Sequence, residues 1–242
     1  MTVERGPGAP TSPISLSGEP ADTQGVAGSG VPVPDAVLEQ LRATGVEVDV
    51  AATSRVDGGR DWWPLAMTWA LDNRVLAVPA AIVRPTSAGQ VRAIAAVCHE
   101  HHIPLTAAAG RSGVCGSSVP ARGGVVVDFC AMAGIVGVDR ESMVVDVRPG
   151  TFGDALEAEL QDDFGLTVGH WPQSMTLSTV GGWLACRGAG QLSNRYGKIE
   201  DMVVGLDVVL SDGRLIRTGG HARAATGSDL NQLFVGSEGT LG

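Results

Sequence analysis

The order of hydrophobic and polar residues predicts amphipathic helices along much of the chain. Apolar side chains recur at helical spacing just after residue 35, and Gly45 is suited to end that helix. Ser87 and Gln90 form a capping-box pattern, which marks the start of a second helix. The apolar stripe of that helix consists of Val91, Ile94, Ala95 and Cys98. Thr151 and Asp154 predict a further helix start. Its inward face would hold Phe152, Ala155, Leu156 and Leu160.

Short apolar runs between these helices predict strands. They cover residues 75–83, 103–106, 124–129, 143–147 and 202–210, and the third and fourth of them are expected to be buried. Ser211-Asp212-Gly213 predicts a hairpin turn into a last strand at 215–217. We therefore expect an α/β (α+β) fold with mixed sheets flanked by helices. The chain contains no internal repeat.

Composition divides the chain into three regions. Residues 1–34 are rich in Pro, Gly, Ser and Thr and predict a disordered leader. Residues 35–74 predict an N-terminal helical segment, in which Trp62, Trp63 and Trp69 would pack that segment onto the main body. Residues 75–242 form the main domain.

Charge and composition exclude several function classes. The 242 residues are 44% hydrophobic, enough for a substantial core, and the net charge is −9. An acidic chain is a poor partner for nucleic acid, because phosphate binding draws on basic surface. A single dinucleotide is still acceptable, since backbone N–H groups can hold its pyrophosphate.

The cysteines and the apolar runs favour a cytoplasmic protein. The four cysteines form no CxxC pair, and no histidine pair stands at zinc spacing, so we expect free thiols and no metal site. The start of the chain lacks the apolar core of a secretory signal. No apolar run approaches the roughly 20 residues that a transmembrane helix needs.

A glycine-rich stretch follows the strand expected at 103–106. It reads AGRSGVCG over residues 109–116, and glycine allows both close approach to an anion and positive φ. No Lys-Ser/Thr follows the glycines, which excludes an ATP-binding P-loop, and the spacing GxxGxxG is not that of a Rossmann site. These residues leave two interpretations open: a loop that cradles a pyrophosphate in another fold, and an ordinary surface turn.

Two downstream motifs extend this pattern. Residues 172–183 read PQSMTLSTVGGW, and residues 236–242 read GSEGTLG. In this order and at these intervals, the three stretches resemble the FAD-binding domain of the vanillyl-alcohol oxidase / p-cresol methylhydroxylase family. The resemblance covers residues from about 75 to 242 and implies a two-lobed FAD-binding PCMH-type domain. Its first lobe would span 75–170 and hold the pyrophosphate, and its second lobe, 171–242, would be incomplete. We expect the cap domain that follows in the family to be absent, so that the domain would be C-terminally truncated.

The same resemblance implies a set of cofactor-binding residues. Ser112 keeps the hydroxyl of the family's GGGTS loop, whereas Ala109 and Arg111 depart from glycine. We expect a negative φ at Ala109 and a solvent-facing side chain at Arg111, with a phosphate contact of Arg111 as the alternative. Trp183 is expected to pack in the core. The implied FAD-binding residues are Ala109, Gly110, Arg111, Ser112, Gly113, Pro172, Ser174, Ser178, Thr179, Gly181, Gly182, Ala185, Gly188, Ser237, Glu238, Gly239, Thr240 and Leu241.

Some family members tether FAD through a histidine in the first loop. Because Ser112 holds the aligned position, we expect non-covalent FAD. His99, His101 and His102 predict a cluster at the C-terminal end of a helix, where the helix dipole favours them. His170 precedes the second stretch, and we expect it on the surface or hydrogen-bonded rather than beside the flavin.

The resemblance leaves more than one function open. TVGGW, the following arginine and the later YGKIED are most similar to alkylglycerone-phosphate synthase, which exchanges an acyl group for a fatty alcohol. Glycolate and D-lactate dehydrogenases of the family are the alternative. They usually have Asn where Trp183 stands, which favours the synthase. A non-catalytic flavin-binding fragment is the second alternative. The partners implied are a small-molecule substrate, with lipid-related compounds among the candidates, and a second copy in a homodimer. We expect no catalytic residue within this chain.

Overall fold

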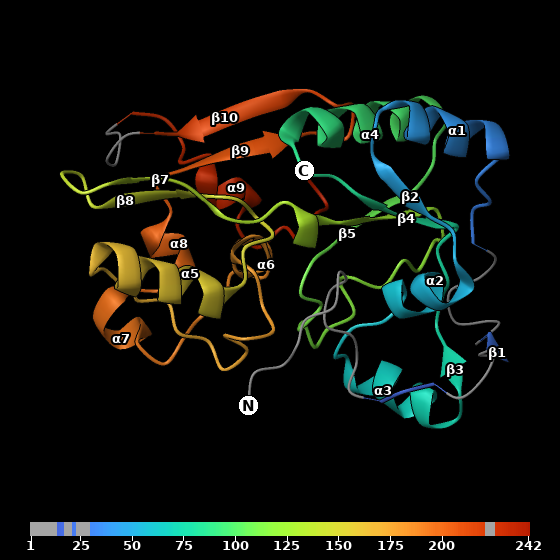
Figure 1. Ribbon diagram of the computed structural model, residues 1–242, viewed down its shortest axis with the longest axis horizontal. Coiled ribbons are helices and arrows are strands. Elements are labelled where there is room, and N and C mark those ends of the chain that lie inside the picture. The colour runs from blue at the N-terminus through green and yellow to red at the C-terminus, as the bar shows by residue number, and fades with distance from the viewer. Residues whose placement is uncertain (1–13, 17–20, 23–29, 221–225) are drawn as a thin grey trace.

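The computed structural model describes residues 14–16, 21–22, 30–220 and 226–242 of the chain. Most of the leader expected at 1–34 lies outside these residues. The described chain folds into two halves that lie side by side, and its C-terminal end lies between them (Figure 1). The mixed α/β class predicted from the sequence is confirmed. No helix among the described residues is long and apolar enough to cross a membrane.

The N-terminal half is built on a four-stranded mixed sheet. Its strands are β2 (Glu47–Asp49), β4 (Ala81–Arg84), β6 (Val125–Asp128) and β5 (Leu105–Ala108), in that spatial order. The inner strands β4 and β6 are parallel, as are β6 and β5, while β2 runs antiparallel at the edge. A short parallel pair of β1 (Ala21–Asp22) and β3 (Arg74–Val75) lies apart from this sheet.

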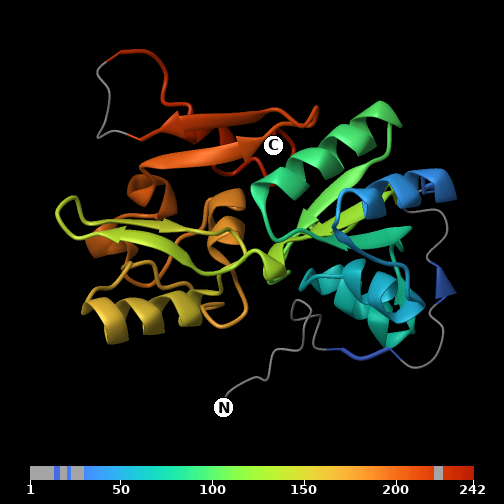
Figure 2. The ribbon, with the colours of Figure 1, turned by 45° about the horizontal axis from the view of Figure 1, so that its top comes forward.

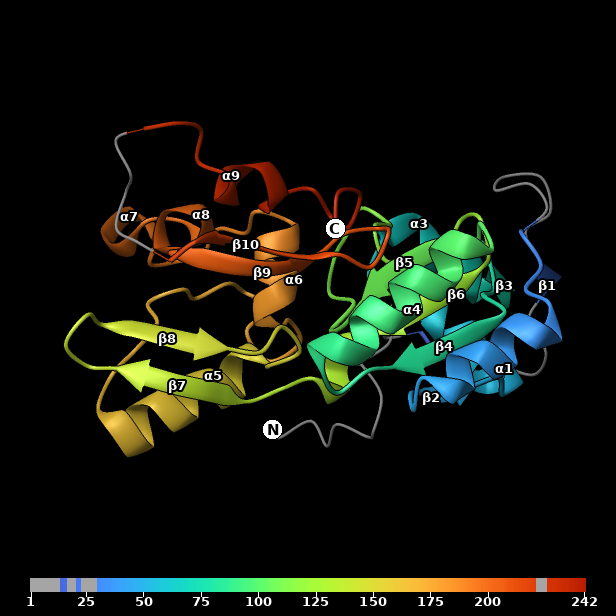
Figure 3. The same cartoon turned by 90° about the horizontal axis from the view of Figure 1, so that it is seen from above.

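Helices cover both faces of this sheet. Helices α1 (Asp35–Ala43) and α4 (Ala88–Glu100) lie on one face, and α2 (Ala52–Gly58) and α3 (Pro64–Leu71) lie on the other side (Figures 1 and 3). Alternating strand residues divide between the two faces. Val125 and Val127 of β6 join the core under α1 and α4, whereas Val126 packs with Ile82 and Ala108 on the opposite face.

The C-terminal half contains two antiparallel hairpins and several short helices (Figure 2). The hairpins are formed by β7 (Ile135–Asp139) with β8 (Val144–Val147) and by β9 (Gly205–Val209) with β10 (Leu215–Gly219). The helices are α5 (Gly153–Glu159), a π-helical turn (Leu160–Phe164), α6 (Val180–Ala185), α7 (Ser193–Tyr196), α8 (Ile199–Met202) and α9 (Asn231–Phe234). Helices α5, α6 and α8 and the π-helical turn share a core that includes Leu156, Trp183 and Ile199.

The two halves are joined by a short 3-10 turn, and they also meet along helix α4. The 3-10 turn, Phe129–Ala131, connects β6 to β7. The buried cores therefore divide the chain near residue 132, whereas the resemblance placed the lobe boundary at 170. Residues 135–168 lie in the later half because the β7–β8 hairpin packs on the core around Trp183. The β9–β10 turn also contacts α4, where Arg92 Nε donates to the Gly213 carbonyl oxygen at 3.2 Å.

Local signals located most elements correctly. The Ser87 hydroxyl accepts the N–H of Gln90, which confirms the predicted helix start. Gly45 follows α1 with a φ of +78°, and Gly213 turns the last hairpin with a φ of +83°. The histidine cluster lies at the end of α4, with His101 as its C-cap residue.

Three predictions about local structure were wrong. The run at 75–83 is interrupted, and only its ends belong to β3 and β4. Met143 is 66% exposed, and β8 is only half-buried, because the hairpin covers the core with one face and leaves the other to solvent. Ala155 is exposed on α5, and the Thr151 hydroxyl bonds to the Arg148 carbonyl instead of capping that helix.

Candidate functional site

The first glycine-rich loop and the second stretch meet between the two halves. Gly110 is the second residue after β5, and its Cα lies against the backbone of Leu177 and Ser178. A Cβ at position 110 would overlap the Leu177 carbonyl oxygen, so only glycine allows this approach. Two segments that are more than sixty positions apart in sequence therefore form one surface.

The third stretch joins the same region. The Gly236 N–H donates to the Leu184 carbonyl at 2.9 Å, and the Glu238 N–H donates to the Ala185 carbonyl at 3.0 Å. Gly239 lies beside Ala107 of β5, at the base of the first loop. All three stretches predicted from the sequence thus converge, and Figure 1 shows the C-terminal end at this junction.

The first loop offers unpaired backbone donors. Within the part of the chain that the structure describes, the N–H groups of residues 110–113 donate to no acceptor. Arg111 adopts a left-handed φ of +53°, whereas Ala109 is not among the residues with positive φ, as expected. Ser112 and Gly113 are half-buried. Free N–H groups and a hydroxyl in one glycine-rich loop suit a pyrophosphate, which is acceptor-only and anionic.

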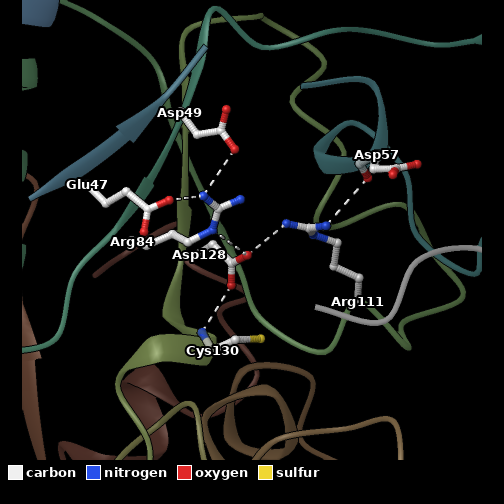
Figure 4. Close-up of polar contacts among 7 residues, drawn as sticks. All are labelled: Glu47, Asp49, Asp57, Arg84, Arg111, Asp128 and Cys130. Atoms are coloured by element: carbon white, nitrogen blue, oxygen red, sulfur yellow. Dashed lines mark hydrogen bonds and ion pairs between the residues drawn. The ribbon is translucent and has the colours of Figure 1, made fainter. Parts of the chain in front are cut away.

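Arg111 does not point to solvent, so that expectation was wrong. Its side chain is 4% exposed, and Nη2 lies 3.2 Å from Oδ2 of Asp128 in a buried ion pair (Figure 4). Asp128 is 1% exposed and closes β6. The physical reason is pairing: a buried carboxylate at the end of the strand needs a cation, and the loop carries Arg111 next to it.

Asp128 is also connected to the rest of the N-terminal half. Its Oδ1 accepts the N–H of Cys130 at 3.0 Å, which caps the 3-10 turn between the two halves. The Arg84 guanidinium lies 4.0 Å from Asp128 Oδ2 and bonds to Glu47 and Asp49 on β2 (Figure 4). The loop is therefore anchored to the sheet through side chains as well as through the backbone.

The segment before α3 supports the loop from its other side. The Trp62 N–H donates to the Arg111 carbonyl at 3.3 Å. The Trp63 ring packs on Gly116, where a Cβ would stand 2.9 Å from the ring. Asp61 is fully buried and accepts the Trp63 N–H at 3.0 Å. Burial raises the pKa of Asp61 above its usual value, against the lowering effect of its backbone hydrogen bonds. The prediction that tryptophans pack this segment onto the main body is confirmed for Trp63, whose ring lies on Gly116.

The second stretch uses much of its polar chemistry to build itself. The Ser178 hydroxyl accepts the Trp183 indole N–H at 2.7 Å and donates to the Ser174 carbonyl at 2.8 Å. Thr179 caps α6 by accepting the Gly182 N–H at 3.3 Å. Gly181 lies against Pro149, where a Cβ would be 2.8 Å away. These contacts fix the shape of the stretch and leave its backbone as the surface that faces the first loop.

Trp183 and His170 form an aromatic pair behind this surface. Trp183 is 3% exposed, so the prediction of core packing is confirmed. His170 is 1% exposed, and its ring lies edge-on to Trp183 with the centroids 4.7 Å apart. Neither ring nitrogen of His170 has a hydrogen-bond partner among the described residues. The expectation of a surface or hydrogen-bonded histidine was therefore wrong, and burial lowers the pKa of His170 so that the neutral imidazole is favoured.

The other residues implied by the resemblance differ in their exposure. Pro172, Ala185 and Gly188 are half-buried. Most of the third stretch is exposed: Glu238, with a φ of +49°, Gly239, Thr240 and Leu241. Ser237 is half-buried, and its carbonyl accepts from Thr240.

Sequence reasoning missed two buried acids at this site, Asp61 and Asp128. Each carried a faint signal. Asp128 ends a run of three valines, where a charge in a buried strand calls for a partner, and Asp61 stands before two tryptophans. Neither signal identifies the partner, because the partners come from distant parts of the chain.

Comparisons with known proteins agree with this geometry. A model of the FAD binding domain family matches residues 79–219. The glycolate oxidase subunit GlcD of Bacillus subtilis is 38% identical over 167 residues, which cover 68% of this chain and 35% of that protein. Alkyldihydroxyacetonephosphate synthase of Dictyostelium discoideum is 36% identical over 168 residues, which cover 68% of this chain and 27% of that protein. The chain thus spans about a third of the length of these relatives.

A solved structure has the same fold. One of alkyldihydroxyacetonephosphate synthase matches 97% of this chain and 42% of its own chain, with a TM-score of 0.80 and 26% identity.

Proposed function

The chain belongs to the family of FAD-binding domains of the p-cresol methylhydroxylase type, and on that premise we propose that it holds FAD non-covalently where its three glycine-bearing stretches meet. The observation that carries the proposal is the set of unpaired N–H groups at 110–113, beside the Leu177 and Ser178 backbone. These donors and the Ser112 hydroxyl fit an anionic pyrophosphate.

Each stretch has its own task in this proposal. The first loop binds the pyrophosphate, and the Arg111–Asp128 ion pair holds that loop on the sheet. Gly182 of the second stretch and Gly188, which follows α6, line the flavin, and the third stretch closes the site beside Ala185. When bound, FAD would supply a ring system that accepts a hydride or bonds to a substrate, while the protein positions it and excludes water.

The proposal that FAD is not covalently bound rests on the positions of the histidines. Ser112 takes the place where tethering relatives carry histidine. His99, His101 and His102 lie at the C-terminal end of α4, a helix that covers one face of the N-terminal sheet. His170 is buried behind Trp183. Among the described residues, no histidine belongs to the first loop.

For the whole protein we propose an FAD-linked enzyme that resembles alkyldihydroxyacetonephosphate synthase and exchanges an acyl for an alkyl group on a lipid precursor. Two observations support it: the fold match covers 97% of this chain, and Trp183 is built into the core. Gly153 and Met175 border the indole, and the Ser178 hydroxyl accepts its N–H, so the position is shaped for tryptophan rather than asparagine.

Oxidation of a small 2-hydroxy acid is the second candidate. The observation in its favour is the 38% identity to the glycolate oxidase subunit of Bacillus subtilis. The two candidates differ in their redox outcome: a hydroxy acid leaves the flavin reduced at the end of the reaction, whereas acyl-to-alkyl exchange leaves it oxidised.

The first test is a visible spectrum of the purified protein, before and after acid precipitation. We expect flavin absorbance that moves to the supernatant on precipitation. Colour in the pellet would contradict non-covalent binding, and a protein that stays colourless after incubation with FAD would contradict the proposal as a whole.

The second test separates the two candidate reactions. Glycolate, D-lactate and an acyl dihydroxyacetone phosphate are added in turn to the flavin-loaded protein without oxygen. Bleaching by a hydroxy acid would favour the dehydrogenase. Release of fatty acid from the acyl compound in the presence of a fatty alcohol, with no lasting bleaching, would favour the synthase. A flavin that responds to none of them would indicate a non-catalytic module.

A further inference from the structure

The chain leaves α6 through an arginine in the left-handed region. The Arg187 N–H donates to the Leu184 carbonyl at 3.2 Å. The Gly188 N–H donates to the Trp183 carbonyl at 2.9 Å. Together these bonds form the Schellman motif that ends many helices, and Arg187, with a φ of +54°, takes the position where glycine is usual. An L-residue is strained there, so its side chain calls for a contact that glycine could not make.

The side chain of Arg187 reaches the end of α9. Its Nη2 donates to the carbonyl oxygens of Val235 at 2.9 Å and of Gln232 at 3.1 Å, and its Nε donates to the same Val235 oxygen at 3.3 Å. The last carbonyl groups of a helix have no donor within the helix. Four residues after Gln232, the Gly236 N–H donates to the Leu184 carbonyl instead of back to α9. The guanidinium therefore supplies donors that the end of α9 lacks.

Backbone bonds in the opposite direction complete this contact. The Gly236 N–H donates to the Leu184 carbonyl at 2.9 Å, and the Glu238 N–H donates to the Ala185 carbonyl at 3.0 Å. A Cβ at position 236 would stand 3.0 Å from Arg187 Nε, so the guanidinium lies close against this glycine. The end of α6 and the end of α9 thus each donate to the carbonyls of the other, and the third stretch begins between them.

Glu200 on α8 attracts the guanidinium from a third direction. Its Oε1 lies 4.0 Å from Arg187 Nη1 and also pairs with the Lys198 ammonium. The hydrogen bond from Lys198 lowers the pKa of Glu200, so the carboxylate is charged. The Gln232 side chain adds a bond from α9 to α8, in which Nε2 donates to the Glu200 carbonyl at 3.0 Å. Arg187 therefore lies where α6, α8 and α9 meet.

We propose that Arg187 is a positioning residue, whose guanidinium holds the end of α9 on the end of α6 and so sets the third stretch, residues 236–242, where it closes the FAD site. The inference rests on the proposed binding of FAD and adds a residue outside the three stretches. The role is indirect, because Nε and Nη2 bond to protein carbonyls.

The first test follows the third stretch itself, with no FAD added. Arg187→Gly removes the guanidinium and suits the left-handed backbone, so the variant should fold. Amide hydrogen exchange is measured by mass spectrometry on peptides that cover residues 236–242. We expect exchange there to become about tenfold faster than in the wild type, while peptides from the N-terminal sheet stay unchanged. Exchange at 236–242 that equals that of the wild type would overturn the inference.

Met143→Gly is the matched control for the change of backbone. Met143 has the same φ of +54°, lies in the turn between β7 and β8, and is 66% exposed. Glycine relieves the same strain at this position and removes no donor. We expect Met143→Gly to leave both the exchange at 236–242 and the Kd for FAD as they are in the wild type.

The second test connects the third stretch to the cofactor. We expect the Kd for FAD, measured by fluorescence titration, to rise about tenfold in Arg187→Gly, the effect of losing one charge-assisted hydrogen bond. Arg187→Lys keeps the charge and one donor nitrogen but lacks the planar fork, so it should recover part of the affinity. A Kd for Arg187→Lys no lower than that for Arg187→Gly would assign the loss to the backbone and overturn the role of the side chain.

The outcomes separate this inference from the proposed function. A wild-type protein that takes up no FAD contradicts the proposed function, whatever the exchange experiment shows. Faster exchange at 236–242 in Arg187→Gly together with a wild-type Kd contradicts only the inference, because the third stretch would then not close the site.

Discussion

The Arg111–Asp128 ion pair allows a quantitative prediction about the first loop. Asp128→Asn removes the carboxylate charge and leaves the Arg111 guanidinium buried without its anionic partner; the other contact of this guanidinium is the Asp57 carbonyl oxygen, at 3.5 Å (Figure 4). Breaking a buried pair from one side costs about 3–5 kcal/mol, because an uncompensated charge stays in the interior. We expect the free energy of unfolding to fall by about that amount.

Arg111→Gly should cost less than Asp128→Asn, for two reasons. Arg111 has a φ of +53°, and an L-residue in the left-handed region is strained by roughly 1–2 kcal/mol, which glycine relieves. In addition, Asp128 keeps a cation, because Arg84 Nε lies 4.0 Å from its Oδ2. The net cost of Arg111→Gly is therefore about 2 kcal/mol.

The assay is urea unfolding followed by circular dichroism, with the same flavin content in every sample. The two single variants and Arg111→Gly/Asp128→Asn form a double-mutant cycle, which isolates the coupling between the two residues. Glu39→Gln is the matched control. It breaks the exposed Arg42–Glu39 pair, for which we expect a loss of no more than about 1 kcal/mol.

Two results would refute this reasoning. If Asp128→Asn is no less stable than Glu39→Gln, the buried pair does not hold the loop. If Arg111→Gly costs more than Asp128→Asn, the left-handed backbone at 111 is not strained in the way that we infer.

Three further predictions concern the loop, the thiols and the buried histidine. Gly110→Ala should lower the free energy of unfolding by about 1–3 kcal/mol and weaken FAD binding, because the new Cβ would overlap the Leu177 backbone. Gly137→Ala, which has open space around it, is the control and should change neither quantity. Equal effects of the two variants in urea unfolding and FAD titration would contradict the close approach at Gly110. In the native protein, the exposed Cys115 should react with a thiol reagent at once, whereas Cys98 should react only after unfolding, because burial raises the pKa of Cys98 to about 12. Mass spectrometry after timed labelling checks this order, and early labelling of Cys98 would disprove it. Because the folded pKa of His170 is lowered, the unfolded chain takes up its proton first, so folded stability is lost as the pH falls below about 6.5. His170→Gln should lose less stability between about pH 7.5 and about pH 5.5 than the wild type, and parallel losses in urea unfolding would show that other groups dominate.

Local patterns predicted the elements that depend on local physics. Ser87 caps α4 because its hydroxyl reaches the N–H of the residue three positions later. Gly213 turns the last hairpin because glycine readily adopts a positive φ. Both properties depend on short segments of the chain alone. The errors came where one face of an element depends on its neighbours. Met143 and Ala155 are apolar, yet nothing packs over them, and only the arrangement of the hairpin and α5 decides this.

The candidate site shows the same division. The order and spacing of the three glycine-bearing stretches are in the sequence, and they were enough to indicate the FAD-binding family. The sequence could not place the buried partners. Arg111 and Asp128 are seventeen positions apart, and their pairing follows from two parallel strands that bring the end of β6 beside the loop after β5. The pairing of His170 with Trp183 likewise depends on how the second stretch folds back on itself.

The sequence by itself determined where this chain has to be glycine and where it has to be apolar, because those demands act on single residues and on short periods. Only the tertiary structure decided which charges are buried and which polar atoms are left unpaired. That decision is physical: the cost of a buried charge or a free ring nitrogen depends on every group that surrounds it, and at Asp128 and His170 those groups come from distant segments.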